Sequence, residues 1–146
     1  MKCKVLLKFF GSKKIASVES VTLTLRGMRG STVYEIVNDT EQLELRFYRE
    51  FYSNGESVLK LENSTVVDTC VFIEFMNTCG VIRWDGFHGK HPRNVKDGIM
   101  FSFTAIVNTG QTIRADGSEN FPKGYREFVR GLNNMLEKTN AKETNE

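Results

Sequence analysis

The fold of this chain is decided by residues 99–107, which read Ile99-Met100-Phe101-Ser102-Phe103-Thr104-Ala105-Ile106-Val107. Apolar side chains recur at every second position, and this period of two predicts a strand with one buried face. Asn108-Thr109-Gly110 then predicts a turn, and residues 111–115 predict the returning strand of a hairpin. A connection this short indicates an antiparallel sheet, because parallel strands need much longer crossovers.

A helix is expected directly after this hairpin, over about residues 121–137. Asn120 is a candidate N-cap, and Pro122 suits the first turn of a helix. Charged side chains lie opposite an apolar stripe at helical spacing, so the stripe should cover one face of the sheet. The stripe consists of Phe121, Tyr125, Phe128, Val129, Leu132, Met135 and Leu136.

The first sixty residues also indicate strands. Alternating apolar residues predict them near residues 3–9, 20–26, 32–37, 43–48 and 58–62, with turn residues between. The strongest hairpin signal is Asn54-Gly55, because these residues tolerate the positive φ angles of a type I′ turn. The short spacings favour an antiparallel meander over βαβ units.

A second helix is predicted over about residues 65–79, with N-cap candidates at Asn63-Ser64-Thr65 and an end at Gly80. A buried strand is the alternative for Val71-Phe72-Ile73. The expected fold class is therefore α+β, a meander-like antiparallel sheet of about six or seven strands with two helices packed on it.

Length and composition indicate one domain over residues 1–138, followed by a flexible polar tail at 139–146. The net charge of +2 is too small to indicate nucleic acid or an acidic membrane as the partner. No stretch approaches the ~18 apolar residues of a membrane span, and none has the pattern of a signal peptide. We therefore predict a cytoplasmic location without membrane contact.

The three cysteines fit the same expectation. Cys70 and Cys79 lie nine residues apart on the predicted helix, a rise of about 13 Å that is too long for a disulfide. Cys3 has no zinc-ligand spacing to either of them. We predict that these cysteines are reduced.

The polar connection from Arg83 to Gly98 is the candidate functional segment, because long connections of this kind are uncommon unless they bind something. It holds the single tryptophan and both histidines of the chain. The residues that we expect to contact a ligand are Trp84, Asp85, Phe87, His88, His91, Arg93, Lys96 and Asp97.

For each chemistry that this segment could support, the competing interpretation is a loop that is only solvated. Asp85, His88 and His91 follow one another at intervals of three residues and could bind a divalent metal, but neighbouring glycines disfavour a rigid site. We therefore predict no metal. Lys90 and the nearby basic residues could hold a phosphate or a nucleobase, although Asp85 and Asp97 partly offset their charge.

Catalytic motifs are missing from the sequence, including G-x-S-x-G, H-E-x-x-H, the P-loop and G-x-G-x-x-G. Cys79 is the only thiol near the histidines, so a Cys-dependent hydrolase stays open as an alternative. Asp97-Gly98 and Asp116-Gly117 are typical of turns, and Asp116 or Ser118 could also cap the last helix. We assign no catalytic residue and no cofactor.

A second candidate surface lies among the early strands, near Phe51. Exposed aromatic and arginine side chains are typical of contact surfaces. The competing interpretation is that charge pairs between strands solvate an open sheet face. The residues concerned are Glu44, Arg46, Tyr48, Arg49, Glu50 and Tyr52.

Trp84-Asp85-Gly86-Phe87, Asp97-Gly98 and Phe121-Pro122 follow one another in an order that resembles a group of small, uncharacterised proteins and domains of Gram-positive, often gut-dwelling, bacteria. The resemblance covers mainly residues 64–136, and it implies a bacterial origin but no activity. Thr109-Gly110 departs from the acidic residue before glycine that is usual in this pattern.

The sequence thus predicts a non-enzymatic binding or interaction module of the bacterial cytoplasm that uses the Trp84–Asp97 segment. One alternative is a small metal-assisted or Cys-dependent hydrolase with Asp85, His88 and His91. The other is binding of nucleic acid or an anionic ligand by the basic loop. The partner would be a protein or a small anionic ligand, with nucleic acid less favoured.

Overall fold

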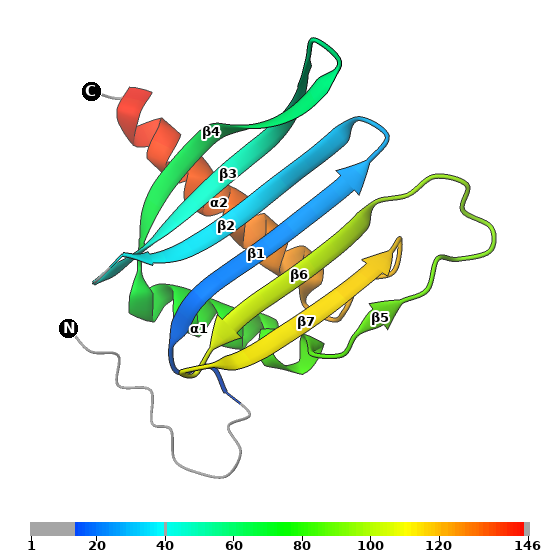
Figure 1. Cartoon of the computed structure of the whole chain (residues 1–146). Helices are drawn as coiled ribbons and strands as arrows, with labels where there is room; N and C mark the ends of the chain where they lie inside the picture. Colours follow the sequence, from blue (N-terminus) through cyan, green and yellow to red (C-terminus); the bar gives the residue numbers. More distant parts are fainter. Residues whose placement is uncertain (1–13, 40, 145–146) are drawn as a thin grey trace.

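The computed structural model describes residues 14–39 and 41–144. Within these ranges, one seven-stranded sheet carries two α-helices on the same face (Figure 1). A short 3₁₀ helix, η1, follows the first α-helix. The elements are β1 (Val18–Gly27), β2 (Gly30–Asp39), β3 (Gln42–Ser53), β4 (Glu56–Asp68), α1 (Thr69–Cys79), η1 (Val81–Trp84), β5 (His88–Gly89), β6 (Met100–Val107), β7 (Gln111–Ser118) and α2 (Tyr125–Thr144).

The strand order is β4-β3-β2-β1-β6-β7-β5. The first four strands form an antiparallel meander, and the β6–β7 hairpin adds to the other side of β1. The two-residue β5 pairs parallel with β7. The structure therefore confirms the α+β class, a sheet of the expected size and the two helices. The sheet is not a continuous meander, because β6 pairs with β1 and not with β4.

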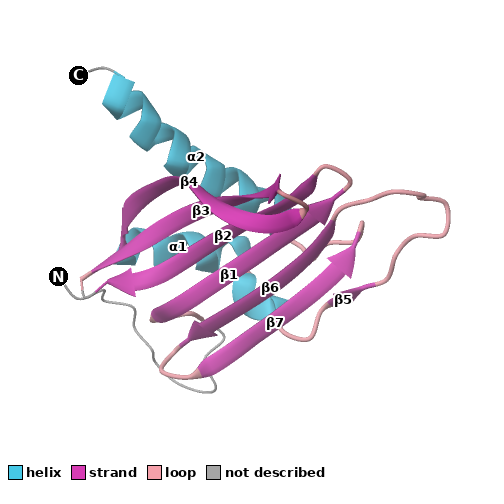
Figure 2. Cartoon of the chain, turned by 45° about the horizontal axis from the view of Figure 1, so that its top comes forward, coloured by secondary structure: helices cyan, strands magenta, loops and turns pink. Residues whose placement is uncertain are grey.

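The two faces of the sheet differ sharply. Side chains that point toward the helices are apolar and buried, including Leu23, Ile36, Leu45, Phe103 and Ile113. No described helix covers the opposite face (Figure 2), which we call the open face. It carries the alternate residues of each strand, which are mainly threonine, serine and charged residues, as the period of two requires.

The β3–β4 hairpin turns at Asn54 and Gly55, whose φ angles of 53° and 80° confirm the expected left-handed turn. Strand β4 is longer than expected, because Ser64 and Thr65 pair with β3 instead of capping a helix. Helix α1 begins only at Thr69, where the Asp68 carboxylate accepts a hydrogen bond from the Val71 N–H. The prediction of a helix start near residue 65 was wrong for this reason.

Helix α1 ends as expected at Gly80, which has a left-handed φ of 72°. The competing strand interpretation of Val71-Phe72-Ile73 is wrong, since these residues lie within α1. Helix α2 begins at Tyr125, four residues later than the expected start. It continues to Thr144, into the stretch from residue 139 for which we predict a flexible tail.

The core lies between the helices and the sheet. Phe128 of α2 is fully buried, stacks on Phe75 of α1 and meets Trp84 edge-on, with ring centroids 5.4 Å and 5.3 Å apart. Phe103 of β6 contacts both Trp84 and Phe128. These contacts confirm that the apolar stripe of α2 packs on the sheet.

Two further expectations concern the first predicted strand and the state of the cysteines. The strand predicted near residues 3–9, with Cys3, lies outside the described residues. Cys79 is a free, buried thiol, whereas Cys70 is disulfide-bonded. The expectation that all the cysteines are reduced was therefore wrong for Cys70.

Candidate functional site

The segment that follows α1 first turns into the core. In η1, Trp84 has only 1% of its surface exposed, and its indole N–H donates to the carbonyl of Lys123 at 2.9 Å. This hydrogen bond satisfies the one polar group of the ring in an apolar environment. Trp84 therefore joins η1 to the start of α2, and this buried position gives it a structural role.

The next residues attach the segment to β7. The Asp85 carboxylate accepts a hydrogen bond from the Arg114 N–H at 3.0 Å, and the Gly86 N–H donates to the Arg114 carbonyl at 2.8 Å. Half-buried Phe87 packs against the core, with its ring 6.2 Å from that of Phe101. These contacts of Asp85 and Phe87 hold the segment against β7 and the core, and neither residue lines the pocket beside β5 that is described below.

Two glycines allow the close approach of β5 to β7. Gly89 pairs with Gly117, and a Cβ atom at either position would lie 2.3 Å from the carbonyl oxygen of Asn120. Real Cβ atoms do not approach oxygen this closely, so a larger residue at either position would push away the Asn120 backbone that lies against both strands. This contact places residues 88–91 at the edge of the open face.

Both histidines of the segment are held by β7. The Nδ1 atom of His88 is hydrogen-bonded to the Oδ1 atom of Asp116, its partner in the parallel pairing. The Nδ1 atom of His91 lies 2.7 Å from the hydroxyl of Ser118, and its Nε2 atom contacts the carbonyl of Val95. The side chains of His88 and His91 are therefore fixed by hydrogen bonds although both residues are exposed.

Beside these histidines lies a pocket of about 570 Å³, which we call the corner pocket. Its size is within the usual range for small-molecule sites. Strand pairing arranges its lining in two rows across β1, β6 and β7. One row contains Arg26, Met100 and Ser118. The other row contains Thr24, Ser102, Asp116 and, on β5, His88. The rest of the lining consists of Gly89, Lys90, His91, Phe101 and Gly117.

The structure brings together only part of the site predicted from the sequence. His88 and His91 line the corner pocket, whereas Arg93, Lys96 and Asp97 are exposed farther along the connection and do not line it. Asp116 and Ser118 belong to β7, so the prediction that they form a turn or cap the helix was wrong. Strand β7 extends to Ser118 because β6 offers pairing partners up to Met100.

Sequence reasoning did not identify the contribution of the sheet to this pocket. Period-two alternation places Arg26, Met100 and Ser102 on the polar side of their strands, and this was the available signal. The pairing of β1 with β6 joins residues more than seventy positions apart, and alternation alone does not predict that pairing.

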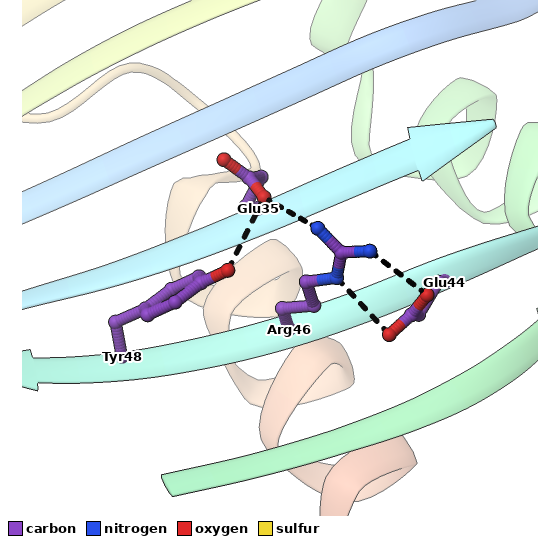
Figure 3. A network of polar contacts seen from close by, with 4 residues as sticks. All are labelled: Glu35, Glu44, Arg46 and Tyr48. Carbon is purple, nitrogen blue, oxygen red and sulfur yellow. Dashed lines mark hydrogen bonds and ion pairs between the residues drawn. The ribbon is translucent and has the colours of Figure 1, made fainter. Parts of the chain in front are cut away.

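A second region of the open face shows how charges are arranged away from the pocket. The Arg46 guanidinium contacts both carboxylate oxygens of Glu44, at 3.0 Å and 3.1 Å, and one oxygen of Glu35 at 3.4 Å (Figure 3). The Tyr48 hydroxyl reaches the same Glu35 oxygen. The hydrogen bond from Arg46 lowers the pKa of the Glu44 carboxyl below its usual range. This β2–β3 network supports the interpretation of an open face solvated by charge pairs.

The charges at the corner pocket are arranged differently. Arg26 is exposed and makes no ion pair with any described residue, and the same holds for the Lys90 ammonium. The carboxylate of Asp116 is hydrogen-bonded to His88 on the far side of the pocket. The pocket therefore offers an incoming molecule two cations that no described carboxylate neutralises.

Another pocket, of about 550 Å³, lies between the end of α1 and the start of α2. Its lining includes Cys79, Trp84 and Phe87, together with the rim residues Arg83 and Lys123. Burial raises the pKa of the Cys79 thiol to about 11, with a smaller contribution from the nearby charge of Glu127. A nucleophilic cysteine needs the opposite shift, so this pocket does not support the Cys-dependent hydrolase.

The metal-assisted alternative also lacks support from the geometry. Within residues 14–39 and 41–144, no group of three or more His, Cys, Asp or Glu side chains is arranged to hold a metal ion. The Asp85 carboxylate is engaged by the Arg114 backbone, while His88 and His91 each bind a different β7 residue.

Comparisons of the chain with known protein families, with curated proteins and with solved structures find no match. None of the helices in the described part of the chain is both long and apolar enough to cross a membrane. The case for function therefore rests on the corner pocket.

Proposed function

We propose that this protein is a non-enzymatic binding module that holds a small organic ligand in the corner pocket. The single observation that supports this most is the composition of the lining. Polar and charged side chains from β1, β6, β7 and the 88–91 segment converge around an exposed apolar residue, Met100. A cavity with a few convergent polar groups is the usual form of a small-molecule site.

The hydrogen-bonded histidines add support, because binding sites gain affinity when their contact groups are ordered before the ligand arrives. The glycine contact between β5 and β7 holds these groups near the sheet. No described group has the arrangement of an activated nucleophile or a metal centre, so we infer binding without turnover.

The test is a thermal-shift screen of the purified protein against small organic molecules, nucleotides, divalent metals and short oligonucleotides. A ligand that binds only the native state raises the melting temperature. Each hit is repeated on Ser102→Tyr, which fills the corner pocket, and on Thr104→Tyr, the matched control. Thr104 lies on the same face of β6, two residues from Ser102, and does not line the pocket.

The proposal expects hits that disappear in Ser102→Tyr and persist in Thr104→Tyr. Hits that survive in both variants would move the site elsewhere on the molecule. A screen without hits would contradict small-ligand binding and favour the second candidate function, which is contact with a protein partner.

The observation behind this second candidate is the outer half of the β3–β4 hairpin. Pairing of β2 with β3 ends at Arg49, and the hairpin beyond it exposes 74% of Tyr52 and about half of Val58, Leu59 and Leu61. Exposed apolar groups gathered in this way are typical of protein contacts. A pull-down with wild-type protein and Leu59→Lys as the control would test this candidate.

Two broader expectations also remain proposals. We place the chain with the Gram-positive group on its Trp84-Asp85-Gly86-Phe87, Asp97-Gly98 and Phe121-Pro122 pattern. The cytoplasmic location is weakened by the disulfide at Cys70, because disulfides are rare in reducing compartments. Fractionation of the native host, with thiol alkylation before lysis, would test the location.

A further inference from the structure

We infer that the ligand of the corner pocket is an organic anion with an apolar body and a hydrogen-bond donor at its opposite end. This inference rests on the proposed binding function and specifies its ligand class. It follows from three features of one row of residues, namely Arg26 on β1, Met100 on β6 and Ser118 on β7.

The charge of the ligand follows from Arg26. Its guanidinium has no ion partner among the described residues, in contrast to Arg46, which contacts two carboxylates on the same face. Lys90 supplies a second cation to the lining, and the one carboxylate of the lining, Asp116, is engaged by His88. A guanidinium binds carboxylates in a bidentate manner, so an anionic group fits the β1 side.

The apolar body follows from Met100, which lies between Arg26 and Ser118 in the row and has 55% of its surface exposed. A methionine side chain is flexible and adapts its shape to aromatic and aliphatic surfaces. Neighbouring strands lie about 4.8 Å apart, so the backbones of Arg26 and Ser118 are separated by roughly 10 Å. One aromatic ring between two polar ends fits this span.

The donor at the far end follows from the hydrogen bonds of His91. The Val95 carbonyl can only accept, so the Nε2 atom of His91 carries a proton. In the tautomer that has this single proton, the Nδ1 atom accepts, and the Ser118 hydroxyl donates to it across 2.7 Å. The remaining lone pairs of the Ser118 oxygen can only accept, so the ligand has to present a donor there.

Three probes of one skeleton separate these features. The first, 4-hydroxybenzoate, has both the anion and the donor; 4-hydroxybenzamide lacks the charge, and benzoate lacks the hydroxyl group. Titration calorimetry or ligand-observed NMR at low salt measures their affinities for the full chain. The variants are Arg26→Gln, Ser118→Ala and the control Arg29→Gln, which removes the same charge at an exposed residue that does not line the pocket.

For wild-type protein we expect 4-hydroxybenzoate to bind about tenfold more tightly than 4-hydroxybenzamide, and several-fold more tightly than benzoate. Arg26→Gln should remove the preference for the acid over the amide and leave the affinity for the amide unchanged. Ser118→Ala should remove the preference for 4-hydroxybenzoate over benzoate. Arg29→Gln should retain both preferences.

Equal or tighter binding of the amide to wild-type protein would overturn the inference while leaving the binding function intact. A preference for the acid that persists in Arg26→Gln would also overturn it. If none of the three probes binds, the inference fails, and the thermal-shift screen with Ser102→Tyr separately decides whether the pocket binds any other small molecule.

Discussion

The open face of the sheet carries two regions with similar side chains and opposite arrangements. On β2 and β3, Arg46 contacts two carboxylates, and the network is complete without any other molecule (Figure 3). At the corner of β1, β6 and β7, Arg26 has no such partner among the described residues and lines a pocket of about 570 Å³. The comparison shows that exposed charge alone does not mark a site; a cation without a partner beside a cavity is more informative.

The source of the difference is the neighbouring strand. Glu35 faces Arg46 across the β2–β3 pair, whereas Met100 faces Arg26 across the β1–β6 pair. An opposite charge directly across a strand pair stabilises it, and methionine leaves the guanidinium available. The following predictions test this contrast, beginning with the largest expected effect.

Both regions depend on the core beneath them, so the largest effect is expected from Phe128→Ala. Loss of its packing against Phe75, Trp84 and Phe103 should lower the free energy of unfolding by about 3–5 kcal/mol. Urea denaturation followed by Trp84 fluorescence measures the change. Val129→Ala, at a half-buried neighbour, should cost clearly less; similar costs would contradict the placement of α2.

Gly117→Ala should disturb the corner without affecting the β2–β3 network. The new Cβ atom would meet the Asn120 carbonyl at 2.3 Å, so we expect a loss of about 1–3 kcal/mol and weaker ligand binding. The control is Gly27→Ala, whose Cβ would meet its nearest neighbour at an ordinary 3.9 Å. Unchanged amide spectra of residues 88–91 in Gly117→Ala would contradict the role of this contact.

Exchanging each arginine for glutamine sharpens the comparison itself. Arg46→Gln should lower stability slightly but measurably, because it breaks ion pairs that solvent screens only in part. Arg26→Gln should leave stability nearly unchanged, because no described carboxylate loses a partner. The same change should reduce the affinity for 4-hydroxybenzoate. Chemical denaturation and titration of both variants measure the two effects. Equal stability losses would show that Arg26 is paired in solution.

The smallest effect concerns the acid titration of Glu44. Its pKa is lowered in the folded state by the hydrogen bond from Arg46, so its contribution to stability is complete above the ordinary carboxyl pKa. That contribution is lost as the pH falls through the lowered folded-state value. NMR titration should place the Glu44 midpoint below the ordinary 4.5, and Arg46→Gln should raise it.

The sequence predicted the fold more completely than the site, for physical reasons. Alternation and helical spacing depend on neighbours along the chain, and they located the hairpins and α2 within a few residues. The start of α1 was misplaced because Ser64 and Thr65 are common helix caps, whereas pairing with β3 places both residues in a strand. Tertiary context of this kind overrides local preference.

Sequence reasoning found only part of the lining of the corner pocket. The two histidines that line it stood out because they are rare residues in a long polar connection, whereas Trp84 lies in the core and the Asp85 carboxylate binds the Arg114 N–H. Arg26 and Ser118 reach the pocket only through strand pairing, which depends on contacts distant in sequence. Local patterns report composition and periodicity, and neither specifies which strands become neighbours.

The most direct test of the central claim is an amide chemical-shift map of the wild-type protein titrated with 4-hydroxybenzoate. The account predicts changes confined to residues 24–26, 88–91, 100–102 and 116–118, which surround the corner pocket. Residues 35–48 of the β2–β3 network should remain unchanged. Shifts centred on that network, or between α1 and α2, would contradict the account.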